Sequence, residues 1–128
     1  RNLTPEQVGA PVDLVVADLS FIPLGLVLPA LLSCARPGAD LLPMVKPQFE
    51  VGRENLPTGG VVRDPAARAA AVQRVADQAW QLGLGVRGVV ASPLPGPSGN
   101  VEYFLWLRSG VPPLERAALE RAVADGPQ

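Results

Sequence analysis

The sequence contains no histidine and a single cysteine, Cys34, among its 128 residues. Without histidine, the chain cannot build a Ser-His-Asp triad or a metal site with imidazole ligands. A single cysteine cannot form a disulfide within the chain, which excludes the small secreted folds that depend on several disulfides. We therefore expect Cys34 to be a small core residue, no bound metal, and a cytoplasmic location.

Charge is also scarce and balanced. Charged residues make up 18% of the chain, and the formal net charge at pH 7 is −1. This composition gives no broad basic surface, so contact with RNA would need a local cluster or a further domain. Hydrophobic residues make up 48%, which is typical of a packed globular domain. The first residues are polar, unlike a signal peptide, and the lack of an initiating methionine is consistent with a piece of a longer protein.

One stretch has the composition of a membrane span. Residues 19–35 carry no charge over 17 residues, a length at the lower limit for crossing a bilayer. Pro23, Gly25 and Pro29 interrupt this stretch, and no second span follows it. A buried helix with proline in or near its first turn is therefore the better interpretation.

Elsewhere the pattern alternates between strands and helices. The apolar run at residues 14–17 predicts a strand buried on both faces, and residues 47–63, which lack helical or strand periodicity, predict a long loop. Further strands are expected at residues 41–46, 84–92 and 101–108, a turn at 36–40, and helices at 24–35, 64–83 and 112–126.

The helix at residues 64–83 has the clearest boundaries. Asp64 suits the N-cap, Pro65 suits the first helical position, and Gly83 suits the C-terminal stop. Helical spacing predicts that its buried face comprises Ala69, Val72, Ala76, Ala79 and Trp80, and that the last helix buries Leu114, Ala118, Leu119 and Ala122.

Strand–helix alternation predicts an α/β fold with a mainly parallel sheet. The last two strands are joined by a short loop without a helix, so they must be antiparallel. Ligands of open α/β sheets bind outside the carboxyl ends of the parallel strands. Asp18 and Lys46 end the first two strands, and Glu102 begins the reversed strand. These three residues are predicted to converge at one edge if their strands are neighbours, although each alone would suit a solvated strand end. Whether Lys46 acts as a fixed cation or as a neutral base is left open by the sequence.

Four motifs carry a resemblance to a known family: VVADLSF, MVKPQFE, GGVVRDP and ASPLPGPSGNVEYFLWL. They resemble the TlyA family of bacterial 16S/23S rRNA cytidine-2′-O-methyltransferases, also labelled hemolysin A, and more broadly the FtsJ-like ribose 2′-O-methyltransferases. The resemblance runs from about residue 3 to the C-terminus. It implies the second half of a Rossmann-like S-adenosylmethionine-dependent methyltransferase fold, in which a reversed strand lies between the last two parallel strands.

The resemblance also implies a catalytic lysine–aspartate–lysine–glutamate tetrad. Asp18, Lys46 and Glu102 match its last three members, whereas the first lysine, the glycine-rich cofactor loop and an S4-type RNA-binding domain would precede Arg1. Lys46 would orient the ribose hydroxyl and help to deprotonate it, with Asp18 and Glu102 positioning the lysines. Methyl transfer from S-adenosylmethionine to ribosomal RNA, free or in a ribosomal subunit, would need the full-length protein.

Further roles are implied for residues near this edge. Asp18 and Leu19 are expected to bind the cofactor. Contact with RNA is expected for Phe49, Arg53, Ser98 and Asn100. Loop packing is an alternative for Phe49, and orientation of Glu102 is an alternative for Ser98 and Asn100. A membrane-active hemolysin or a non-catalytic RNA-binding protein remains the rival interpretation. Because the neighbour of the strand at residues 14–17 would lie upstream, self-association through this exposed edge is also expected.

Overall fold

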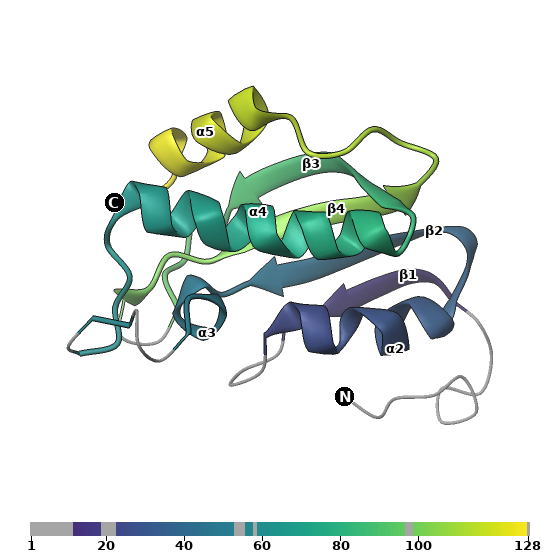
Figure 1. The fold of residues 1–128 in the computed structure, drawn as a ribbon, viewed down its shortest axis with the longest axis horizontal. Coiled ribbons are helices and arrows are strands. Elements are labelled where there is room, and N and C mark those ends of the chain that lie inside the picture. Colours follow the sequence, from purple (N-terminus) through teal and green to yellow (C-terminus); the bar gives the residue numbers. More distant parts are fainter. Residues whose placement is uncertain (1–11, 19–22, 53–55, 58, 97–98, 128) are drawn as a thin grey trace.

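The computed structural model describes residues 12–18, 23–52, 56–57, 59–96 and 99–127. Four strands form one sheet in the order β1-β2-β4-β3 (Figure 1). β1 pairs with β2 in parallel, and β4 runs antiparallel to both of its neighbours, β2 and β3. The reversed strand therefore lies between two parallel ones, as predicted. The bounds of the strands are Val12–Ala17 for β1, Ala35–Val45 for β2, Leu84–Ala91 for β3 and Tyr103–Ser109 for β4.

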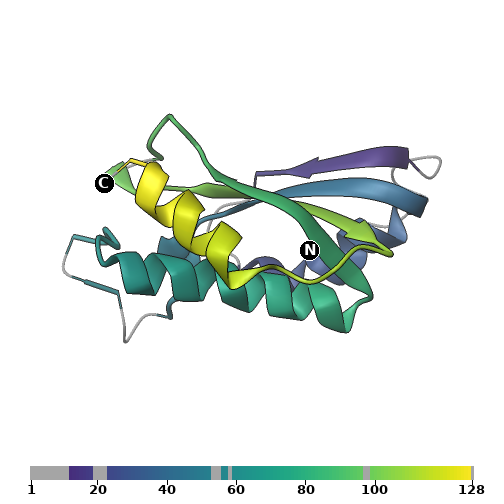
Figure 2. The ribbon, with the colours of Figure 1, turned by 90° about the horizontal axis from the view of Figure 1, so that it is seen from above.

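Helices cover one face of the sheet. Helices α2 and α4 lie along that face, and α5 packs against α4 and β3 (Figures 1 and 2). The helical elements are the 3₁₀ helix η1 (Leu24–Leu26), α2 (Leu28–Ser33), α3 (Pro47–Glu50), α4 (Pro65–Gln81) and α5 (Arg116–Asp125).

Three local predictions are wrong. The helix expected at residues 24–35 consists of η1 and α2 and ends at Ser33. The turn expected at 36–40 belongs to β2, because pairing with β1 extends the strand. The pairing register shifts within this stretch, where Gly38 has a φ of 80°. The long loop begins with the single turn of α3, which is too short to produce a periodic pattern. Pro47 starts this turn at a position where a backbone N–H would have no partner.

The boundaries predicted for α4 are confirmed. The Asp64 carboxylate accepts a hydrogen bond from the Ala66 N–H at 3.0 Å, and Gly83 takes a φ of 84° just beyond the helix. The buried face is partly different, because Trp80 is 49% exposed whereas Arg68 is buried. In α5 the buried residues are Leu119 and Val123, the second of which was not predicted.

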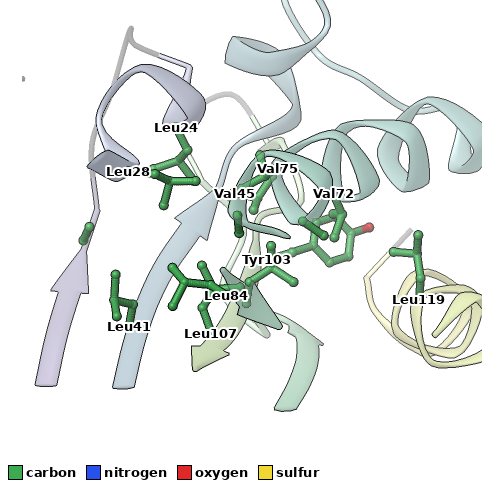
Figure 3. Close-up of a cluster of buried hydrophobic side chains, with 14 of the residues drawn as sticks. Leu24, Leu28, Leu41, Val45, Val72, Val75, Leu84, Tyr103, Leu107 and Leu119 are labelled. Carbon is green, nitrogen blue, oxygen red and sulfur yellow. The ribbon is translucent and has the colours of Figure 1, made fainter. Parts of the chain in front are cut away.

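The core lies between the helices and one face of the sheet (Figure 3). It joins side chains from the strands, including Leu41 and Leu107, to side chains from η1, α2 and α4. The opposite face is open within the part of the chain that is described, and there Leu14 and Val16 are 54% and 63% exposed. The prediction that the first strand is buried on both faces is therefore wrong for this chain, because no described element covers its outer side.

The uncharged stretch does not form a long helix. Its described part contains η1, α2 and the first residue of β2, and residues 19–22 lie outside the described residues. Across the described ranges, the structure contains no helix with the length and apolar character that a bilayer crossing requires.

Candidate active site

The carboxyl ends of β1 and β2 bring two opposite charges into contact. Asp18 directly follows β1 and Lys46 directly follows β2, so their parallel pairing places both residues at one sheet edge. Lys46 Nζ lies 2.5 Å from Asp18 Oδ1. The Lys46 side chain is only 7% exposed, whereas the Asp18 side chain is 61% exposed. The pair therefore presents its carboxylate to solvent and keeps most of the lysine within the protein.

Glu102 lies at the same edge from the other side of β2. Val45 and Tyr103 are partners in the antiparallel ladder between β2 and β4. Lys46 and Glu102 are the next residues outward from this pair, which places them at adjacent strand ends. Glu102 is 5% exposed, and its backbone carbonyl accepts a hydrogen bond from the Ser92 N–H at 2.7 Å. The structure thus brings Asp18, Lys46 and Glu102 to one edge, while their catalytic roles remain predictions.

Two further residues fix the Glu102 side chain. Gln48 Nε2, on α3, donates a hydrogen bond to Glu102 Oε2 at 3.3 Å. Gly96 packs so closely that an added Cβ would lie 2.3 Å from the same carboxylate oxygen. Glycine is required here for close approach rather than for an unusual backbone angle. Sequence reasoning missed both contacts, although the polar Gln48 within KPQFE and the glycine within PLPGPSGN were visible signals.

Asn100 joins two loops beside Glu102. Its Nδ2 donates to the Gly60 carbonyl at 2.9 Å, and its Oδ1 accepts from the Val62 N–H at 2.9 Å. Its own carbonyl accepts from the Gly96 N–H at 2.8 Å, and the residue is 2% exposed. The side chain therefore holds the end of the long loop against the segment that contacts Glu102. Contact between Asn100 and RNA remains a prediction.

Glu50 is a second buried acid near Lys46. It ends α3, is 4% exposed, and its Oε2 accepts a hydrogen bond from the Leu24 N–H at 2.9 Å. Burial raises the pKa of Glu50 above its ordinary value, and the Leu24 N–H and the positive charge of Arg74 only partly oppose that shift. Sequence reasoning assigned no role to this residue.

Arg68, on α4, is buried and contacts the same loop that Asn100 holds. Its Nε donates to the Val62 carbonyl at 3.0 Å, and its Nη1 donates to the Pro127 carbonyl at 3.2 Å. The adjacent Tyr103 is completely buried, which raises the pKa of its hydroxyl, while the charge of Arg68 acts in the opposite direction. Arg68 thus supports the loop that Asn100 also holds.

The remaining predicted site residues are placed only in part. Phe49 lies half-buried on α3. Leu19, Arg53 and Ser98 lie outside the described residues, so the expectations for them remain predictions. Within the described ranges, no group of three or more cysteine, aspartate or glutamate residues has an arrangement that could hold a metal ion.

The topology and the charged edge define an α/β protein whose candidate active site lies at the carboxyl ends of parallel strands. Residues 1–109 match the family described as FtsJ-like methyltransferase. The chain therefore belongs to the FtsJ-like methyltransferase family.

Individual relatives agree with this membership. The chain is 58% identical to the 16S/23S rRNA (cytidine-2′-O)-methyltransferase TlyA of Mycobacterium tuberculosis over 99% of its own length and 49% of that protein. It is 28% identical to hemolysin A of Brachyspira hyodysenteriae, over 72% of the chain and 38% of the relative. The crystal structure of a candidate hemolysin from Lactococcus lactis superposes with a TM-score of 0.88 at 30% identity, over 97% of this chain and 61% of that one. The match thus covers 49% of the first of these two curated relatives and 38% of the second.

Proposed function

We propose that this chain is the C-terminal part of the methyltransferase domain of a longer protein, which transfers a methyl group to a ribose 2′-hydroxyl of ribosomal RNA. The observation that carries this proposal is the nearly buried Lys46, paired with Asp18 at the sheet edge where Glu102 also lies. The identity of 58% to a ribosomal RNA cytidine-2′-O-methyltransferase supports the substrate class. We place this activity in the cytoplasm, where ribosomal RNA and ribosomal subunits would be the partners.

The charges at the edge suit transfer to a hydroxyl group. Lys46, held by Asp18, can donate a hydrogen bond to the ribose oxygen and stabilise its developing negative charge. The hydroxyl proton would pass to a neighbouring base, either the Glu102 carboxylate or the second lysine of the tetrad in its neutral form. Glu102, held by Gln48 and Gly96, adds a second fixed carboxylate beside the lysine. Such fixed groups contribute by holding the attacking oxygen in line with the methyl group. A second lysine from the preceding part of the longer protein would complete the tetrad.

The edge also fits part of a site for S-adenosylmethionine, which supplies an activated methyl group on a positively charged sulfonium. The Asp18 carboxylate is 61% exposed beside the strand ends and offers a negative charge to such a cofactor. The described residues include no glycine-rich turn that follows a strand and opens a helix, the unit that cradles a nucleotide-like cofactor. We therefore propose that the preceding part of the longer protein, together with Asp18 and Leu19, binds the cofactor.

The RNA would approach the same edge. Phe49 lies three residues from Lys46 on α3, where a half-buried ring could stack on a base. Arg53 and Ser98 are the other proposed contacts, with arginine suited to phosphate groups. For Asn100, whose buried side chain is bonded to Gly60 and Val62, we propose the alternative role of holding the loop beside Glu102.

The test is methyl transfer by the longer protein to ribosomal subunits in the presence of S-adenosylmethionine. We expect 2′-O-methylcytidine, detected by mass spectrometry of the digested RNA. Methylation confined to bases, or none with any form of ribosomal RNA, would overturn the proposal.

The name hemolysin A borne by one relative calls for a parallel assay. Leakage of dye from vesicles should stay at background with the same preparation that methylates RNA. Leakage without methyl transfer would favour the membrane-active alternative.

A further inference from the structure

Glu50 is a buried carboxylate to which the proposed reaction assigns no part. It is 4% exposed, and its Oε1 makes no hydrogen bond with any residue that the structure describes. Burying a carboxylate is unfavourable unless the group makes a contact that compensates for the lost water. The contact that Glu50 does make, between its Oε2 and the Leu24 N–H, therefore indicates its role.

Leu24 begins η1, where a backbone N–H lacks a partner within the helix. The preceding residue is Pro23, whose side chain cannot accept a hydrogen bond as a serine or aspartate would. The Glu50 carboxylate takes that place, and its negative charge suits the start of a helical segment. Leu24 itself is 2% exposed in the core, so the hydrogen bond joins Glu50 to a fixed point of the fold.

Leu24 lies six residues after Asp18 in the chain. Two contacts thus reach residues 46–50 from this part of the chain: Asp18 contacts Lys46, and the Leu24 N–H donates to Glu50. Lys46 directly precedes α3 and Glu50 is its last residue, so both contacts are made by the same short segment. An ion pair with an exposed partner contributes little on its own. The buried hydrogen bond is therefore the stronger of the two constraints.

We infer that Glu50 is a positioning residue, which holds the segment carrying Asp18 against the segment carrying Lys46 through the Leu24 N–H. Glu50 does not act on the substrate, because its unpaired oxygen is enclosed by the protein. Gln48, on the same helical turn, holds Glu102. α3 thus contacts the Glu102 carboxylate directly, and it also contacts Leu24, six residues after Asp18. The catalytic consequence of this inference rests on the proposed function, whereas the structural link does not.

The structural link is tested by hydrogen exchange of the longer protein, read by mass spectrometry on a peptide covering residues 23–28. Glu50→Ala should accelerate exchange in this peptide by roughly tenfold, because the Leu24 N–H loses its acceptor. Glu50→Gln keeps an acceptor oxygen and should leave the exchange close to wild type. Unchanged exchange in Glu50→Ala would overturn the inference. Should Glu50→Ala fail to fold, Glu50→Leu, which fills the space but accepts no hydrogen bond, should accelerate exchange in the same way, and unchanged exchange in folded Glu50→Leu would overturn the inference.

The catalytic consequence is tested by a double-mutant cycle with Asp18→Asn under single-turnover conditions. Alone, Glu50→Ala should lower the rate of methyl transfer by about tenfold with little change in RNA affinity, and Glu50→Gln should restore most of that rate. In the Asp18→Asn background, Glu50→Ala should add less than about a twofold loss, since both changes disrupt one arrangement. Multiplicative losses would overturn the coupling to Asp18.

A matched control is Leu119→Ala, which removes a fully buried side chain of α5 and destabilises the fold without touching the edge. It should lower the melting temperature but leave both the exchange of residues 23–28 and the transfer rate at wild-type values. If the wild-type protein transfers no methyl group, the proposed function fails, and the exchange result still decides whether Glu50 holds Leu24.

Discussion

At the scale of single residues, the site depends on an unequal ion pair. Most of the Lys46 side chain is enclosed, whereas its partner Asp18 faces solvent. A lysine placed in this way has few alternative conformations, so its ammonium group is held in one position before any substrate arrives. This arrangement suits a group that must meet a ribose oxygen at a defined distance.

Replacing Lys46 should therefore affect chemistry more than binding. In the longer protein, Lys46→Ala is expected to lower methyl transfer by about 100-fold or more, the usual contribution of a positioned acid or base. Calorimetry should show that S-adenosylmethionine still binds, because the proposed role of Lys46 is at the hydroxyl. Glu102→Gln should be milder, since the amide still accepts a hydrogen bond. Near-normal turnover by Lys46→Ala would contradict the assignment.

The buried Glu50 should leave a signature in the dependence of stability on pH. Burial raises the pKa of Glu50 in the folded chain above the ordinary value of 4.5. Between pH 4.5 and the pKa of the folded state, the folded chain therefore binds the proton more tightly than the unfolded chain. The stability that the protonated acid contributes is thus fully present below about pH 4.5, and it is lost as the pH rises through the pKa of Glu50 in the folded state. Urea denaturation should show wild type losing stability relative to Glu50→Gln over this window. A pH-independent difference between the two would count against a raised pKa.

At the scale of elements, the loop between β3 and β4 is fitted around the Glu102 carboxylate. Gly96→Ala would place a methyl group where that carboxylate now lies, and the displaced side chain is enclosed on its other sides. We expect methyl transfer to fall by about tenfold with a loss of about 1–3 kcal/mol in stability from overpacking. Gly88→Ala is the control, because its added methyl group would meet only Trp106 Cε3, at 3.9 Å. Equal activity of the two variants would show that the close contact is unimportant.

The connection between the two loops at Asn100 can be tested separately. Asn100→Ala removes the hydrogen bonds to Gly60 and Val62 and leaves their backbone groups without partners. We expect a loss of about 2–3 kcal/mol in the free energy of unfolding, measured by urea denaturation at low protein concentration. Gln73→Ala, which removes an exposed hydrogen bond to Asp77, should change it by less than about 0.5 kcal/mol. A loss no larger than that of Gln73→Ala would mean that the loops are held by other contacts.

The order of the elements was predictable because long apolar runs and end signals mark them locally. The extension of β2 could not be predicted from the sequence, since it depends on pairing with β1. The helix α3 could not be predicted either, because it is too short to show a periodic pattern. The convergence of Asp18, Lys46 and Glu102 was predicted on the condition that their strands are neighbours, and the pairing of β2 with both β1 and β4 meets that condition. The contacts of Gln48 and Glu50 join residues 54 and 26 positions apart, and no local pattern specifies such pairs.

At the scale of the whole molecule, the described elements cover one face of the sheet and leave the other face open. β4 shows this plainly, because Leu105 and Leu107 are fully buried while Trp106, between them, is 38% exposed. On the same sheet, β1 pairs only with β2 among the described residues, so it forms an edge strand with unpaired backbone groups on its outer side (Figure 1). In the proposed longer protein, the preceding half of the domain would cover this edge.

The chain on its own should therefore self-associate through β1. An edge strand that exposes Leu14 and Val16 is a template for pairing with a second copy, and light scattering over a concentration series should show association. Val16→Lys, which places a charge on the edge, should restore the monomer. Leu94→Lys is the matched control, because Leu94 is 76% exposed but lies in the loop after β3, away from β1. The longer protein should show no association that depends on Val16. A wild-type chain that stays monomeric at high concentration, or that associates equally with lysine at position 16, would show that this edge does not drive association.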